Sequence, residues 1–163
     1  MTFQPIPYLD CHICEIELLE TASVTSVLTP LNLGSIIVDT GGQISVNANY
    51  ITFPANTQFF VKANVVGQCV NGSTTITSCD VMFMDASNTI VPYQGTGLAV
   101  ARTGALSDSW YSSVDCIMML FSSASPRAYR LSIANVSVAQ PIRIPYNNAT
   151  SYIPNSTITI MYK

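Results

Sequence analysis

The residues that could carry out chemistry are few in this chain, and they are most concentrated near the N-terminus. Cys11-His12-Ile13-Cys14 places two cysteines at the spacing of a zinc knuckle, around the only histidine of the sequence. A second pair of ligands would have to come from Cys69 and Cys79, which are too far apart in sequence to form another knuckle. We therefore expect no metal and no other cofactor. Cys11 and Cys14 are the metal candidates, against the simpler interpretation that both are small buried thiols.

Groups for enzymatic catalysis are equally sparse. A triad of the Ser-His-Asp or Cys-His type would have to use His12, and no oxyanion-hole motif lies near it. Paired carboxylates for glycoside cleavage would have to come from acids that nothing in the sequence pairs. These acids are Asp80, Asp85, Asp108 and Asp115. No phosphate-binding or dinucleotide-binding fingerprint occurs, so we expect a protein without catalytic residues.

The five cysteines are an odd number, which fits poorly with a closed disulfide framework. Cys69 and Cys79 flank Asn71-Gly72, a strong turn signal. If they face each other across a hairpin, they are a candidate disulfide in an oxidising medium. Cys116 lies within an apolar stretch and is expected to be an ordinary core residue.

The composition narrows the class of protein. The 163 residues suit one domain, and 48% hydrophobic with only 9% charged residues argues against disorder. The net charge is −3 and no Lys/Arg cluster occurs, so we expect no nucleic-acid partner. No apolar run is long enough for a membrane span, so we expect no membrane partner. The first residues resemble no secretory signal, and we expect synthesis in a cytoplasm.

Apolar and polar residues alternate along much of the chain, and no helical stripe follows Gly34. In Phe59–Val65 and in Tyr129–Ile133, the residues of one side are apolar, as in a strand with one buried face. Trp110–Phe121 is apolar on both sides, so we expect burial of both its faces. Short strands at near-regular spacing, with turn signals between them, predict an all-β sandwich or barrel.

Residues 1–34 differ from the rest, because they hold four of the nine acidic residues, the histidine and no basic residue. A group of aliphatic residues within them fits either one face of a short helix or part of a strand. These residues are Ile13, Ile16, Leu18 and Leu19. We interpret residues 1–34 as an N-terminal arm or added edge element, and residues 35–163 as the β-sandwich domain.

The segment Ile51-Thr52-Phe53-Pro54-Ala55-Asn56-Thr57-Gln58-Phe59-Phe60-Val61-Lys62-Ala63-Asn64-Val65 resembles a recurring segment of tumour-necrosis-factor-like and complement-globular-head-like jelly rolls. Such domains occur in bacteriophage head-decoration and fibre proteins. The resemblance extends over about residues 36–163, and the later strands follow in the family's order. The turn glycine of the family is Asn56 here, and asparagine tolerates a left-handed backbone. The usual tyrosine is Gln58, with aromatics displaced to Phe59 and Phe60.

The resemblance implies an antiparallel jelly-roll β-sandwich that assembles as a homotrimer. In the family, three strands belong to the sheet that faces the threefold axis; here they would be Phe59–Val65, Tyr129–Ile133 and Ile158–Tyr162. The candidates for the trimer contact are then Phe60, Tyr129, Arg130 and Tyr162.

We therefore expect a virion structural protein on the capsid surface, a trimeric decoration or cement protein that clamps subunits of the major capsid protein. One alternative is the receptor-binding head of a short tail or head fibre, and another is a carbohydrate-binding module. In the fibre head, loops on the rigid sandwich would hold the ligand. The candidate loop residues are Tyr93, Tyr146 and Tyr152.

Overall fold

The computed structural model describes residues 11–19, 29–69, 77–89, 91, 98–100, 110–120, 124–137, 142–143 and 156–163. These residues form eleven β-strands and no helix. The strands are β1 (His12–Leu19), β2 (Asn32–Asp39), β3 (Ser45–Asn47), β4 (Tyr50–Phe53), β5 (Phe59–Cys69), β6 (Thr77–Asp85), β7 (Leu98–Val100), β8 (Trp110–Leu120), β9 (Arg127–Ser137), β10 (Ile142–Arg143) and β11 (Thr157–Tyr162).

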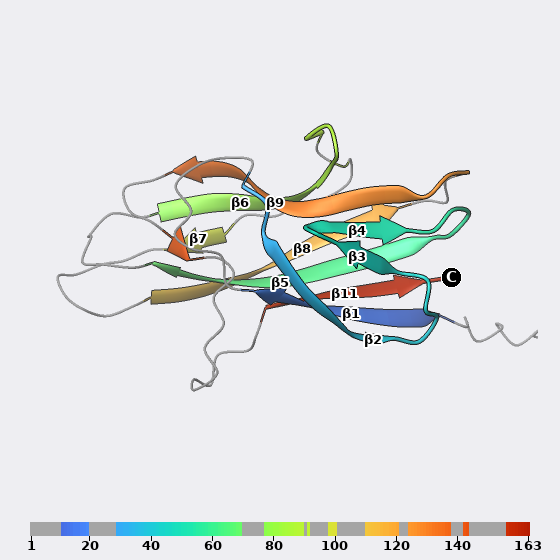
Figure 1. Cartoon of the computed structure of the whole chain (residues 1–163). Coiled ribbons are helices and arrows are strands. Elements are labelled where there is room, and N and C mark those ends of the chain that lie inside the picture. The colour runs from blue at the N-terminus through green and yellow to red at the C-terminus, as the bar shows by residue number, and fades with distance from the viewer. Residues whose placement is uncertain are drawn as a thin grey trace, which may run out of the picture.

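The strands form two antiparallel sheets that face each other as a sandwich (Figure 1). The first, which we call sheet A, has the order β10-β5-β11-β1-β2. Strand β8 also belongs to this sheet and pairs with β5 along its whole length. The second, sheet B, has the order β3-β4-β9-β6-β7. Strands that follow one another in sequence thus often lie in opposite sheets, as in a jelly roll. The predicted all-β jelly-roll sandwich is confirmed.

Period-two alternation builds the core between the sheets. Phe59, Val61, Ala63 and Val65 of β5 all point inward and are buried, as the sequence predicts. Inward residues of the other long strands complete one continuous cluster. They include Cys14, Ile16, Leu18, Val81, Phe83, Cys116, Met118, Leu131, Ile133, Ile158 and Ile160.

Strand β1 corrects the interpretation of residues 1–34 as an arm or edge element. Its backbone pairs with β11 on one side and with β2 on the other, so it is an interior strand of sheet A. Cys14, Ile16 and Leu18 are fully buried at every second position, which settles the choice between helix and strand. The predicted boundary at residue 34 is wrong as well, because it falls inside β2.

The segment before β2 ties the two sheets together at one edge. Leu31 N–H donates to the Leu131 carbonyl and Ile133 N–H donates to the Thr29 carbonyl, both at 2.9 Å. Residues 29–31 therefore lie along β9 of sheet B, and the chain then continues as β2 in sheet A (Figure 1). Leu31 is fully buried at this crossing, so the segment closes one side of the core.

The turn between β4 and β5 has the backbone that the resemblance requires. Asn56 adopts φ 55°, the left-handed conformation expected at the position of the family's glycine. The Thr57 hydroxyl donates to the Ala55 carbonyl at 3.0 Å and stabilises the turn.

Three further expectations need correction. Strand β8 buries Cys116 and Met118, but Ile117 between them is 39% exposed, so β8 is not buried on both faces. Strand β9 belongs to sheet B, so Tyr129–Ile133 does not share a sheet with β5 and β11. The sequence analysis does not predict the short strands β7 and β10, because two or three residues give no periodic signal.

Candidate functional site

The outward face of sheet A is the most distinctive surface of the part that the structure describes. Six large hydrophobic side chains are exposed among the described residues, and every one lies on a strand of sheet A. They are Ile13, Leu19, Ile37, Val38, Ile117 and Met161. Exposed apolar residues are ordinary when scattered, but their restriction to one of two sheets marks a surface suited to a partner.

Strand register brings three apolar side chains of this face into one row. Ile13 of β1 is the cross-strand neighbour of Met161 in β11, and Met161 is the neighbour of Phe60 in β5. Cross-strand neighbours lie about 5 Å apart, so the three side chains form a continuous strip across three strands. We call Ile13, Met161 and Phe60 the apolar row.

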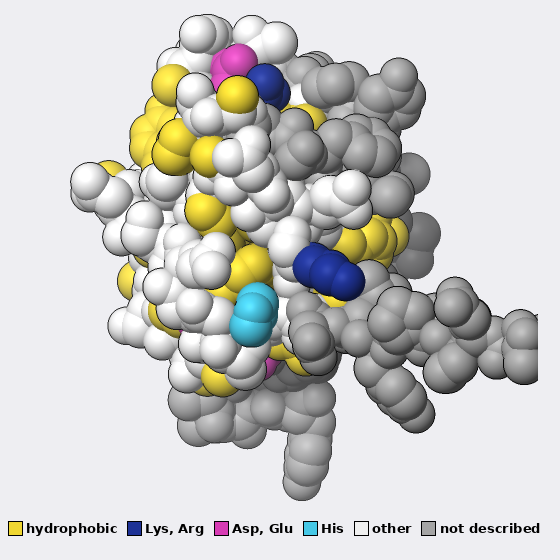
Figure 2. Space-filling model, turned by 90° about the vertical axis from the view of Figure 1, so that its right-hand side faces the viewer, with side chains coloured by type: hydrophobic (Ala, Val, Ile, Leu, Met, Phe, Trp, Pro, Cys, Tyr) yellow, Lys and Arg dark blue, Asp and Glu magenta, His cyan; other side chains and the backbone are white. Residues whose placement is uncertain are grey.

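The next row of the same face mixes apolar and charged groups. Val38, Glu15, Thr159, Lys62 and Ile117 follow one another across five strands. An acid and a base therefore stand on either side of Thr159, with an aliphatic side chain at each end. The face therefore combines apolar area with charges of both signs. Figure 2 shows hydrophobic side chains among uncharged polar ones at one end of the sandwich, where few charged side chains are seen.

Of the four side chains predicted to meet a neighbour across the trimer, Phe60 lies on this face. Tyr129 and Tyr162 point into the core, with exposed fractions of 5% and 2%, so they have no area to offer a second copy. Arg130 lies in sheet B, where its guanidinium donates to Asn88 Oδ1 and lies over the Tyr50 ring at 5.7 Å. The assignments of Tyr129 and Tyr162 are therefore wrong, because both side chains point inward. The assignment of Arg130 loses its basis, because β9 does not share a sheet with β5 and β11.

Tyr162 joins the last strand to the loop that leads from β2 to β3. Its hydroxyl donates to Asp39 Oδ1 at 2.5 Å and accepts from Gln43 N–H at 3.5 Å. Asp39 also accepts from the N–H groups of Gly41 at 3.2 Å and of Ile44 at 3.0 Å. The loop at Gly41-Gly42 is thus held by a carboxylate. A side chain at residue 41 would overlap the Tyr162 hydroxyl, so this loop needs glycine there.

This hydrogen-bonded group shifts two pKa values in opposite directions. Burial raises the pKa of Asp39, but bonds from Tyr162 and from the N–H groups of Ile44, Gly41 and Gly42 lower it by more in sum. The carboxyl pKa therefore lies below its ordinary value. Burial and the bond to Asp39 raise the pKa of Tyr162 to about 12.

The geometry of β1 argues against zinc at the two N-terminal cysteines. Cys11 is exposed and Cys14 is fully buried, because residues three apart on an extended strand point to opposite sides. A zinc knuckle needs a turn that brings both sulfurs to one ion. Burial also raises the pKa of Cys14 to about 12, so it stays a neutral thiol. His12 instead packs its ring against Tyr162, with centroids 5.3 Å apart.

The other cysteines and the candidate acids are distributed over both sheets. Cys116 is a core residue, as predicted, and burial raises its pKa to about 12. Among the described residues no group of three or more His, Cys, Asp or Glu side chains could hold a metal. Asp80 and Asp85 lie on β6 of sheet B, whereas Asp115 lies on β8 of sheet A. Asp108 lies outside the described residues.

The predicted hairpin between Cys69 and Cys79 is wrong. Strand β5 ends in sheet A, where Cys69 pairs with Trp110 and Ile142. Strand β6 begins in sheet B, where Cys79 pairs with Leu98 and Val136. A disulfide between them would join two sheets rather than two strands of a hairpin. Their side chains lie outside the described part, so the pairing itself stays a prediction.

The loop residues predicted to bind a ligand, Tyr93, Tyr146 and Tyr152, also lie outside the described residues. The sequence analysis did not recognise Ile13, Met161 and Ile117 as residues of a contact surface, although the sequence carries a signal for them. Each is an apolar residue at the outward position of a strand whose inward positions are also apolar.

No helix in the described part of the chain has the length and hydropathy that a membrane span requires.

Comparisons with known proteins find similarity only among solved structures. No protein-family model matches this chain, and no curated protein matches it. Among solved structures, it is similar to the globular domain of zebrafish complement 1qA protein. The TM-score is 0.45 and the sequence identity 10%, over 93% of this chain and 95% of that chain.

Proposed function

We propose that this chain is a non-catalytic structural protein that assembles as a homotrimer through sheet A and decorates the capsid of a virus. The observation that carries the proposal is that, among the side chains that the structure describes, the exposed large apolar ones all lie on strands of sheet A. A sandwich whose described exposed apolar side chains lie on one sheet has a preferred face for packing against copies of itself.

The weak charge of the chain supports self-association. With 9% charged residues, little like-charge repulsion opposes contact between copies. Where charges do occur on the outward face of sheet A, they have both signs. Glu15 of one copy can meet Lys62 of another in an assembly with rotational symmetry, because a heterologous contact joins different parts of the same face.

The proposal of a virion role rests on the resemblance of residues 51–65 to decoration and fibre jelly rolls. The left-handed turn at Asn56 supports that resemblance. A trimer on a capsid would contact several coat subunits at once, and many weak contacts across a symmetric site stabilise a shell by mass action. Sheet B and the loops would then be available to the major capsid protein or to the surroundings.

Light scattering of the purified chain, followed by sedimentation with empty capsids of a candidate virus, tests this function. We expect three times the chain mass in solution and a capsid-bound copy number set by icosahedral symmetry. A trimer present in only a few copies per virion, and bound to host cells, would favour a fibre head instead. A monomer at all concentrations, with no capsid binding, would contradict the proposal.

A further inference from the structure

One row across the outward face of sheet A ends in an exposed aliphatic side chain on both sides. The row takes one residue from each of five strands: Val38 of β2, Glu15 of β1, Thr159 of β11, Lys62 of β5 and Ile117 of β8. Val38 is 40% exposed and Ile117 is 39% exposed. At this level β2 and β8 are the outermost strands that the structure describes, so the two side chains mark the two ends of the row.

The two ends cannot cover each other within one chain. Neighbouring strands lie about 4.8 Å apart, so four strand spacings place Val38 about 19 Å from Ile117. Covering an exposed aliphatic side chain is favourable because it removes apolar area from water. In one chain both ends keep that area exposed, so a contact that covers them has to come from another molecule.

A threefold axis parallel to the strands brings the two ends together. Because cross-strand neighbours lie directly opposite each other, the row runs perpendicular to the strands, and rotation about such an axis keeps it at the same height. When three copies turn sheet A toward the axis, the middle of each row faces inward. The β2 end of one copy then meets the β8 end of the next. This contact joins two different patches, and three repeats of it close a ring.

The charges beside the two ends have opposite signs. Glu15 is the cross-strand neighbour of Val38, and Lys62 is the neighbour of Ile117. A contact between a β2 end and a β8 end therefore brings an acidic region toward a basic one, whereas two β2 ends would bring two acids together. Charge complementarity thus favours contact between unlike ends.

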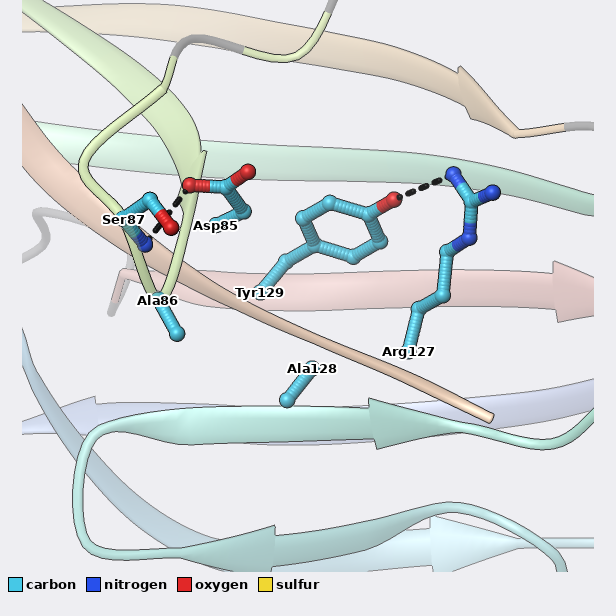
Figure 3. A pocket seen from close by; sticks show the side chains of 6 residues that line it. All are labelled: Asp85, Ala86, Ser87, Arg127, Ala128 and Tyr129. Atoms are coloured by element: carbon cyan, nitrogen blue, oxygen red, sulfur yellow. Dashed lines mark hydrogen bonds between the residues drawn. The ribbon is translucent and has the colours of Figure 1, made fainter. Parts of the chain in front are cut away.

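The hollow on sheet B, where β6 ends and β9 begins, offers a neighbouring copy less. It has a volume of about 300 Å³ and is lined by Asp85, Ala86, Ser87, Arg127, Ala128 and Tyr129. Figure 3 shows the Tyr129 ring between the carboxylate of Asp85 and the guanidinium of Arg127. Arg127 Nη1 donates to the Tyr129 hydroxyl at 3.4 Å, and Asp85 Oδ1 accepts from Ser87 N–H at 2.8 Å. These polar groups have partners within the chain, whereas the aliphatic ends of the row on sheet A stay exposed.

We propose that the β2 end of sheet A in one copy packs against the β8 end in the next, with Val38 on Ile117 at each of three equivalent contacts. The inference rests on the proposed trimer and adds which parts of sheet A meet. The apolar row at Ile13, Met161 and Phe60 then lies on the surface that faces the axis.

Disulfide trapping of the full chain tests the contact. The variant carries Val38→Cys, Ile117→Cys and Cys11→Ser, the last to remove an exposed native cysteine. A disulfide forms only where two Cα atoms approach to about 4–7 Å, which residues 38 and 117 reach only between copies. After mild oxidation with diamide, we expect a covalent trimer on a non-reducing gel. Mass spectrometry of its peptides should identify the disulfide between residues 38 and 117.

In the matched control, Leu19→Cys replaces Val38→Cys. Leu19 is 43% exposed on the same face, but it lies four residues from Glu15 along β1, about 13 Å from the row. The control should form no covalent trimer, and equal crosslinking in both variants would overturn the assignment. Covalent dimers of the first variant would mean a twofold contact and would overturn it too.

Light scattering separates this inference from the proposed function. A trimeric wild type whose cysteine variant yields no disulfide between residues 38 and 117 would overturn the inference alone. A monomeric wild type would contradict both.

Charge substitution gives a second test that needs no oxidation. Val38→Lys and Ile117→Glu should each raise the concentration at which half of the trimer dissociates about tenfold, because a charge interrupts an apolar contact. The double variant should return to within about threefold of wild type, because opposite charges then meet. Within one chain these charges are about 19 Å apart, beyond the Debye length of about 8 Å, so the rescue has to come from contact between copies. A double variant that dissociates as readily as the single variants would overturn the proposal.

Discussion

The two sheets of this sandwich have similar inward faces and different outward faces. Both bury an apolar side chain at every second position, so their inward faces are equivalent. Outward, sheet A carries the apolar row, whereas sheet B carries Arg130 over the Tyr50 ring. This difference teaches that alternation decides which residues form the core. The residues between them, which point outward, decide what each sheet can bind.

Removing residues 1–34 should have the largest effect on this two-sheet arrangement. The deletion takes away β1 from the interior of sheet A, together with the segment at Pro30 that pairs with β9. We expect the loss to exceed the whole stability of a domain this size, about 5–15 kcal/mol. Far-ultraviolet circular dichroism and a thermal melt should show an unfolded chain. A cooperative melt of the shortened chain would mean that β1 is an appendage after all.

Within sheet A, Tyr162→Phe removes the hydroxyl that joins β11 to Asp39. We expect a loss of about 1–2 kcal/mol at neutral pH, measured by urea unfolding, because a hydrogen bond to a carboxylate is lost. The carboxyl pKa is lowered in the folded state, so its contribution is present above the ordinary pKa of 3.8 and is lost as pH falls through the folded value. The difference between wild type and variant should therefore shrink in acid.

At alkaline pH, stability should fall as pH rises, the opposite of its change in acid. The pKa of Tyr162 is raised from 10.0 to about 12, so the stability it contributes is complete below pH 10.0 and is lost between these values. The variant has no such phenol and should lose less stability over that interval. Parallel pH profiles of the two proteins would show that the Tyr162–Asp39 bond does not contribute to the fold.

On sheet B, Tyr50→Leu should have the smallest effect. It removes the ring beneath Arg130 but keeps an apolar side chain on the strand, and we expect a loss of about 0.5–1 kcal/mol. The urea unfolding midpoint measures it, with Arg130→Met as the partner substitution. If the two losses add fully in the double variant, the ring and the guanidinium do not interact.

Period two predicted much of the fold, since the inward residues of β5, β9 and β11 all follow it. A local backbone requirement was also readable, because asparagine at residue 56 is compatible with φ 55°. Sheet membership was not readable, because Tyr129 alternates identically whether β9 lies in sheet A or sheet B. The spacing of Cys11 and Cys14 suggested a metal site because spacing alone does not tell a turn from the extended strand that β1 forms. The apolar row went unseen because Ile13, Met161 and Phe60 become neighbours only through strand register.

The central claim is that the outward face of sheet A, and not that of sheet B, joins copies of this chain. Met161→Glu places a charge in the middle of the apolar row, and Ser45→Glu places the same charge at an exposed position on β3 of sheet B. Both sites are at the surface, so each variant should fold with a stability within about 0.5 kcal/mol of wild type. In light scattering, wild type and Ser45→Glu should be trimers and Met161→Glu a monomer. A trimeric Met161→Glu, or a Ser45→Glu that alone falls apart, would contradict the account.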